Sequence, residues 1–139
     1  MTEGLLDFFK NDRFAAMSGA ELTEVGSGYA KARLLVGDCH LNGAGICQGG
    51  AVFTLADLAF AAAVNSHGQV TVSVTANITF CHAAKKGWLY AEAREIVNHP
   101  RLPYVEVTVT DQEANIIAVM TSSGYRKKDF LPGYENREP

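Results

Sequence analysis

Residues 51–64 form the stretch that most restricts how this chain can fold. In the sequence AVFTLADLAFAAAV, only Thr54 and Asp57 are polar. The stretch is rich in alanine and leucine and is about four turns long, so we expect a helix. A surface helix normally shows a polar face, but Thr54 and Asp57 are all that this one offers. We therefore expect a helix buried almost all round, inside a sheet and against a second subunit.

Asp57 is a carboxylate in the middle of this apolar helix. Burying an unpaired carboxylate costs several kcal/mol, so the residue needs a reason to be there. Two interpretations remain open. Asp57 could bond a neighbouring backbone or an arginine across an interface, which is a structural role. It could also be a general base, because desolvation raises the pKa of a carboxyl group into a useful range.

The segments around this helix predict an α+β fold. Leucines and phenylalanines at the start suit a short amphipathic helix that ends near Gly19, and residues 21–36 suit one or two strands with a glycine break. Alternating, β-branched patterns separated by short turns predict further strands over residues 70–80, 88–97, 104–111 and 115–127. Strands at such short spacing imply an antiparallel sheet.

Length, charge and composition limit the function classes. A chain of 139 residues predicts one domain, here over residues 1–128, followed by a polar and frayed tail over residues 129–139. The net charge of −3 argues against a nucleic-acid partner. The start lacks a basic signal region and the apolar run is too short for a bilayer, so no membrane association is expected. Three cysteines without CxxC spacing predict free thiols in the cytoplasm, and the scattered histidines predict no metal; no cofactor is expected.

A glycine-rich loop, HLNGAGICQGG, leads into the helix. A helix that begins near Gly49 and Gly50 offers free backbone N–H groups and the positive end of the helix dipole. Such an end stabilises an oxyanion or a polarised carbonyl, although a plain flexible turn would have the same composition. The loop contains neither GxxxxGK[ST] nor a complete GxGxxG, so it is not a phosphate-binding loop.

The stretch HLNGAGICQGGAVFTLADLAFA resembles the signature of the PaaI-like hotdog acyl-CoA thioesterases, the phenylacetate-degradation type, which is roughly N-G-x-G-x-x-H-G-G-x-x-F-x-L-A-D. The segments ELTEVGSGYAKARLLV and VSVTANITF resemble the strands on either side, so the resemblance covers about residues 5–127. It implies a hotdog fold, in which a curved antiparallel sheet wraps a long helix. It also implies acyl-CoA as the substrate, a homodimer with active sites at its interface, and association into a homotetramer.

By this resemblance, Asp57 matches the catalytic carboxylate, which acts as general base on water or as nucleophile. Gly49 matches the glycine whose N–H binds the thioester carbonyl, and Asn42 the asparagine that orients the carbonyl or the water. Ser73 matches a hydroxyl that holds the water in some members. Gln48 stands where the family has histidine, and glutamine can form hydrogen bonds but cannot titrate. The substrate-binding positions are Gln48, Gly50 and Phe53.

The leading hypothesis is hydrolysis of a small aromatic or short- to medium-chain acyl-CoA. Phe53 and Phe60 flank Asp57 on the helix and could shape an acyl pocket. A hotdog dehydratase is disfavoured because the motif histidine is missing. A protein that binds acyl-CoA without turnover stays open because of Gln48. Several basic residues are expected in solvent, where some could attract the phosphates of coenzyme A: Lys85, Lys86, Arg126, Lys127 and Lys128.

Overall fold

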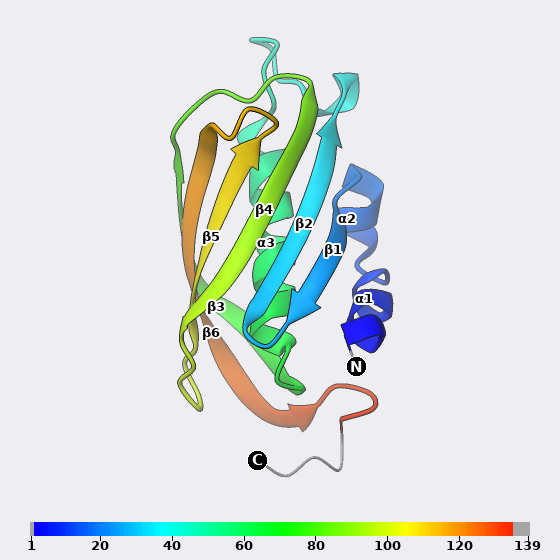
Figure 1. Cartoon of the computed structure of the whole chain (residues 1–139), viewed down its shortest axis with the longest axis vertical. Helices are drawn as coiled ribbons and strands as arrows, with labels where there is room; N and C mark the ends of the chain where they lie inside the picture. Colours follow the sequence, from blue (N-terminus) through cyan, green and yellow to red (C-terminus); the bar gives the residue numbers. More distant parts are fainter. Residues whose placement is uncertain (1, 135–139) are drawn as a thin grey trace.

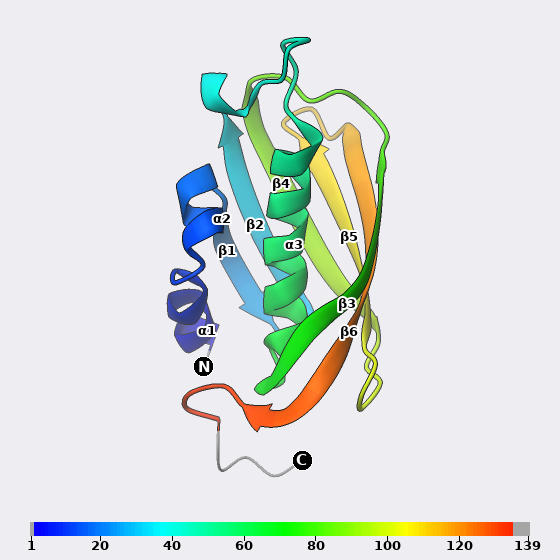
Figure 2. The same cartoon turned by 180° about the vertical axis from the view of Figure 1, so that it is seen from behind.

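The computed structural model describes residues 2–134. Its main elements are a long helix, α3 (Gly49–Asn65), and six strands: β1 (Glu21–Gly26), β2 (Tyr29–Val36), β3 (Gln69–Phe80), β4 (Gly87–Val97), β5 (Tyr104–Asp111) and β6 (Ile116–Phe130). The strands form one antiparallel sheet in the order β1-β2-β4-β5-β6-β3, and this sheet curves around α3 (Figures 1 and 2). The expected architecture, a long helix wrapped by a curved antiparallel sheet, is confirmed.

The first segment forms two short helices, α1 (Thr2–Phe9) and α2 (Arg13–Ser18), where the sequence predicts one. The break comes from Asp12, whose side chain accepts a hydrogen bond from the Ala15 N–H and so starts a new helix. Gly19 ends α2 in the left-handed conformation, as expected for a helix that stops near this residue. A single-turn helix, η1 (Asp38–His40), follows β2.

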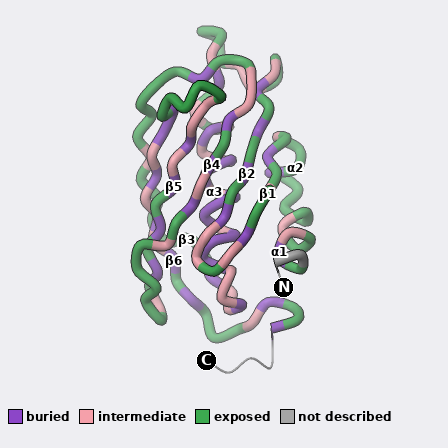
Figure 3. The backbone as a smooth tube through the Cα atoms, viewed as in Figure 1, coloured by how far each residue is buried: buried purple, intermediate pink, exposed green. Residues whose placement is uncertain are grey.

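The core lies between α3 and the concave face of the sheet (Figure 3). Alternate side chains of β5, Val105, Val107 and Val109, point at the helix and are fully buried. Alanines at positions 56, 59, 62 and 63 let the helix approach the sheet closely. The opposite stripe of α3 stays partly accessible in a single chain: Gly50, Thr54, Asp57 and Ala61. The helix is therefore covered on all sides but one.

The two edges of the sheet differ. Strand β1 is short, and α1 packs beside it. Strand β3 has 12 residues, pairs with β6 on one side and pairs with no strand of residues 2–134 on the other. It exposes Val72 and Val74. A long, apolar and open edge of this kind readily pairs with a second chain.

The end of the described chain belongs to the fold. Strand β6 continues to Phe130, past the boundary expected at residue 128. Leu131 and Tyr134 are then buried, and the ring of Tyr134 lies against Gly68. The expected frayed tail is therefore wrong up to Tyr134; its last residues, 135–139, lie outside the described part. No helix within residues 2–134 is long and apolar enough to cross a bilayer.

Arg126 is buried, which corrects the expectation that it is solvated. Its side chain is 6% exposed and lies 3.6 Å from the carboxylate of Glu95, which is 7% exposed. Glu95 also contacts His67 at 2.9 Å, and Arg126 donates to the side-chain oxygen of Asn98 at 2.8 Å. The sequence suggested a solvated residue because Arg126 begins a run of cations. The alternation of β6 instead turns it to the helix side, as it does Gly124.

Candidate active site

The loop before α3 is shaped by Asn42. Its side-chain oxygen accepts hydrogen bonds from the backbone N–H groups of Ala44 (2.9 Å) and Ile46 (3.3 Å). Gly45 adopts a φ of +78°, which completes the turn at little cost for a glycine. Because the amide oxygen serves the loop, the Nδ2 group of Asn42 is the part that can donate to a substrate carbonyl or to water.

His40 ties this loop to α2. Its Nδ1 accepts from the Gly37 N–H (3.0 Å), and its Nε2 lies 2.5 Å from the backbone oxygen of Ser18. This pattern places the ring hydrogen on Nε2, which donates to Ser18. The backbone oxygen of His40 also accepts from the Gln48 N–H. His40 therefore has a structural role close to the site.

The start of α3 presents one unused backbone donor. Gln48 is the N-cap residue, and its side-chain oxygen accepts from the Gly50 N–H at 3.2 Å. Gly49 is the first residue of the helix, so its N–H has no acceptor within the helix, and no other acceptor in residues 2–134 replaces it. The Phe80 ring lies directly against Gly49. The structure thus leaves the Gly49 N–H, at the positive end of the helix dipole, free for a ligand.

Asp57 lies on the accessible stripe of α3 and is half-buried. Its carboxylate makes no hydrogen bond or ion pair with any residue that the structure describes. Burial, followed by the negative charge of Asp12 at the N-cap of α2, raises the pKa of Asp57. Asp57 follows Gly49 by eight positions, which is about 12 Å along a helix. The structural alternative, in which Asp57 is held by a partner, finds no partner within the described part of the chain.

The remaining predicted residues differ in how far they are buried. Ser73 lies on the inner face of the edge strand β3, with its hydroxyl 3.5 Å from that of Ser122. Phe53 is half-buried on α3. Phe60 is fully buried and points toward Gly124 of β6, so it belongs to the core. The idea that Phe60 shapes an acyl pocket is therefore wrong.

A pocket of about 450 Å³ lies between α2, the loop and the first turns of α3. Its lining includes residues around the start of α3 and residues of α2, among them Asn42, Gln48, Gly50, Thr54, Phe14 and Met17. Phe14 and Met17 are apolar yet 64% and 79% exposed. The sequence did not point to these two residues; the available signal was apolar side chains on the outer face of a short helix.

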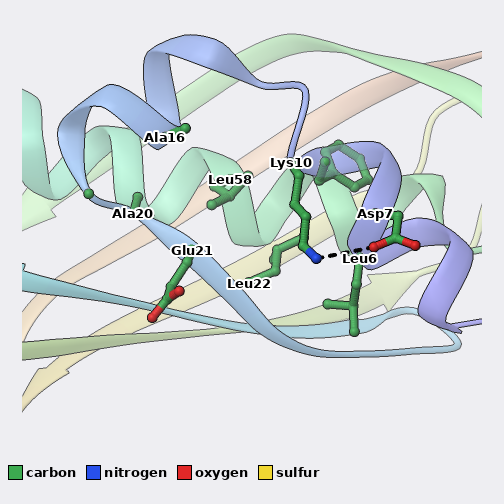
Figure 4. Close-up of a pocket in the computed structure, with 10 residues that line it drawn as sticks. Leu6, Asp7, Lys10, Ala16, Ala20, Glu21, Leu22 and Leu58 are labelled. Carbon is green, nitrogen blue, oxygen red and sulfur yellow. Dashed lines mark hydrogen bonds and ion pairs between the residues drawn. The ribbon is translucent and has the colours of Figure 1, made fainter.

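A larger pocket, of about 840 Å³, lies between α1, α2 and β1 (Figure 4). Leu6, Leu22 and Leu58 line it, and the Asp7–Lys10 ion pair stands at its rim. None of the predicted site residues lines this pocket. Asn42, Gln48 and Gly50 line the smaller pocket at the start of α3, which makes it the better candidate; Gly49 and Asp57 line neither pocket.

Comparisons with known proteins identify the family of this chain. Residues 44–118 match the thioesterase superfamily, which is more than half of the chain. A putative esterase of Archaeoglobus fulgidus is 38% identical over 135 residues, which cover 95% of this chain and 88% of that protein. The chain belongs to the thioesterase superfamily. The matched region contains Gln48, Gly49 and Asp57.

Within the thioesterase superfamily, the acyl-coenzyme A thioesterase PaaI of Escherichia coli is 27% identical over 126 residues, or 90% of each protein. The solved structure of E. coli PaaI gives a TM-score of 0.86 and covers 89% of this chain and 91% of that one. A Streptococcus mutans protein solved with acetyl CoA gives 0.77 at 25% identity, over 81% of this chain and 91% of that one. The expected PaaI-like hotdog family is confirmed, and this thioesterase is a thioester hydrolase.

Proposed function

We propose that this thioesterase hydrolyses small aromatic or short- to medium-chain acyl-CoA thioesters to the free acid and coenzyme A. Two features of α3 carry this proposal. Its first residue, Gly49, has a free backbone N–H, and its accessible stripe holds the half-buried carboxylate of Asp57, which has no partner among residues 2–134. The names of E. coli PaaI and of the acetyl CoA complex support coenzyme A as the thiol half of the substrate.

The proposed chemistry needs few groups. The Gly49 N–H, with the Nδ2 group of Asn42, binds the thioester carbonyl oxygen and stabilises the negative charge that develops on it. Asp57 takes a proton from the attacking water, or attacks the carbonyl carbon itself. The carbon–sulfur bond then breaks and the thiolate leaves. In the route by direct attack, water then hydrolyses the anhydride between the acyl group and Asp57, which releases the acid and restores the carboxylate. Because a thiolate is a good leaving group, no strong general acid is required.

We place each site between two chains. One carbonyl group cannot contact both Gly49 and Asp57 of the same helix, because they lie about 12 Å apart and catalytic contacts span about 3 Å. Pairing of the open β3 edges would bring the accessible stripes of two α3 helices together. Gly49 of one chain would then face Asp57 of the other, and Ser73 of β3 would border the site.

The pocket at the start of α3 suggests the acyl class. Phe14 and Met17 line it beside the polar loop, and its volume of about 450 Å³ suits an aromatic ring or a short chain. Phe53 and Gly50 would contact the thioester from the helix. A phenylacetyl-type group, a role in phenylacetate degradation, a homotetramer and a cytoplasmic location follow from the PaaI relationship and complete the proposal.

The experiment is free-thiol release from a panel of aryl and aliphatic acyl-CoAs, with wild type and Asp57→Asn in parallel. We expect turnover by the wild type and a loss of ~100-fold or more in the variant. The best substrate identifies the acyl class. Binding of acyl-CoA without thiol release by the wild type would instead favour the binding protein that Gln48 leaves open.

A further inference from the structure

His40 joins three segments beside the candidate site. Its Nδ1 atom accepts a hydrogen bond from the Gly37 N–H at 3.0 Å, directly after β2, and its Nε2 atom lies 2.5 Å from the backbone oxygen of Ser18 in α2. Its own backbone oxygen accepts from the N–H of Gln48, the N-cap residue of α3, at 2.8 Å. One residue therefore fixes α2 relative to the end of β2 and to the start of α3.

Helix α2 has few other attachments. Ala15 is its only buried side chain. Within the described part of the chain, the other hydrogen bonds of residues 13–18 join them to residues 12–20 alone. The bond between His40 and Ser18 is therefore the one hydrogen bond that ties α2 to a distant segment of residues 2–134. Without it, the position of α2 would depend mainly on the packing of Ala15.

The pocket at the start of α3 takes its apolar wall from α2. Phe14 and Met17 form this wall, and His40 and Ser18 line the same pocket. Both apolar side chains are largely exposed in the single chain, so the position of α2 decides where they lie. Asn42, on the polar side of the pocket, belongs to the loop that follows His40. The bond between His40 and Ser18 therefore sets where the apolar wall lies relative to the polar loop.

We infer that His40 is a positioning residue that sets acyl selectivity, because it holds Phe14 and Met17 of α2 at this pocket. The inference rests on the proposed function, since it takes the acyl group to be bound there. A bulky apolar acyl group, such as phenylacetyl, gains affinity by burying surface against the wall from α2. An acetyl group fills little of a pocket of about 450 Å³ and gains little from that wall. Loss of His40 therefore weakens binding of bulky acyl groups and leaves the chemical step intact.

Two substitutions separate the two hydrogen bonds of the ring. In His40→Asn, the side-chain oxygen can replace Nδ1 as the acceptor for the Gly37 N–H, but the side chain is too short to reach Ser18. In His40→Gln, the amide nitrogen can replace Nε2 as the donor to Ser18. His40→Asn therefore releases α2, whereas His40→Gln keeps it in place.

The ligands are thioether analogues of phenylacetyl-CoA and acetyl-CoA, in which a CH₂ group replaces the carbonyl and prevents hydrolysis. Calorimetry measures their affinities. We expect His40→Asn to weaken binding of the phenylacetyl analogue about ten-fold and to leave the acetyl analogue unchanged. His40→Gln should match the wild type for both. Met17→Ala leaves every hydrogen bond of His40 in place and should show the same selective loss as His40→Asn.

A double-mutant cycle shows whether His40 acts through α2. When Phe14→Ala and Met17→Ala have already removed the wall, adding His40→Asn should cause no further loss of affinity for the phenylacetyl analogue. Losses that simply add would overturn the inference. So would equal losses for both analogues, a His40→Asn protein that binds both as the wild type does, or a wild type that does not bind the phenylacetyl analogue.

Hydrolysis separates this inference from the proposed function. With phenylacetyl-CoA as the substrate, His40→Asn should raise KM about ten-fold at unchanged kcat, whereas both constants for acetyl-CoA should stay the same. A wild type that binds the analogues with this dependence on His40 but releases no thiol would contradict the function and keep the inference. Hydrolysis of both substrates with no dependence on His40 would keep the function and overturn the inference.

Discussion

At the scale of single residues, a substitution at Gly49 can remove one backbone N–H while the helix stays intact. Proline is favoured at the first helical position, and Gln48 already has the extended conformation that a following proline requires. Gly49→Pro and Gly49→Ala both add a Cβ about 3.0 Å from the Phe80 ring, but only proline lacks the N–H. We expect kcat to fall ~100- to 1,000-fold more in Gly49→Pro than in Gly49→Ala. Equal losses in steady-state assays would assign the effect to crowding by Phe80.

Asp57 should set the acid limb of the pH profile. Burial, followed by the charge of Asp12, raises the pKa of Asp57. In the proposed mechanism the carboxylate is the active form. Activity should therefore fall as the pH drops through a pKa above the ordinary aspartate value. Asp12→Asn keeps a good helix cap but removes the charge, which lowers the pKa of Asp57. The acid limb of kcat/KM should therefore shift to lower pH. An acid limb that does not move would show that Asp12 has no influence on Asp57. Gln48 adds no further limb, because it cannot titrate.

At the scale of elements, the buried ion pair joins β4 to β6. Arg126→Met leaves the carboxylate of Glu95 buried without its cation, which typically costs about 3 kcal/mol or more of stability. The double variant Glu95→Gln/Arg126→Met removes both charges and should recover part of that loss. Urea unfolding of the two variants checks this. An Arg126→Met protein as stable as the wild type would mean that His67 alone satisfies Glu95.

Most elements could be predicted from their own residues. The alternation of β5 and the alanine-rich pattern of α3 are strong local signals, and both elements lie within a few residues of the predicted bounds. The break between α1 and α2 was missed because it depends on a single cap, Asp12. The burial of Tyr134 depends on a contact with Gly68, which lies far away in the sequence. No local sequence pattern predicts a contact between residues so far apart in the chain.

The residues of the candidate site also differ in whether a local sequence pattern indicates them. Gly49 and Asp57 could be proposed from the sequence because they belong to one continuous motif that ends in α3. Phe14 and Met17 could not, because α2 reaches the pocket only through the fold: His40 bonds Ser18 and so holds α2 beside the loop. Residues that tertiary contacts bring to a site form no motif of fixed spacing, so a single sequence does not reveal them.

At the scale of the whole molecule, two inactive variants should complement each other. If each site lies between two chains, as proposed, co-expressed Asp57→Asn and Gly49→Pro chains form mixed dimers in which one site has both defects and the other has none. Random pairing should then recover about a quarter of wild-type activity. Each variant assayed alone is the control and should be nearly inactive. If Gly49 and Asp57 acted from the same chain, mixing would restore nothing.

If each site needs Gly49 of one chain and Asp57 of another, turnover also depends on the abundance of the protein. When chains are scarce enough to be mostly separate, the number of complete sites grows with the square of the chain concentration. Doubling expression in that range would quadruple the flux, whereas at high expression flux would follow the amount of protein in simple proportion. Gene dosage would then act on this enzyme as a threshold, with no effector molecule involved.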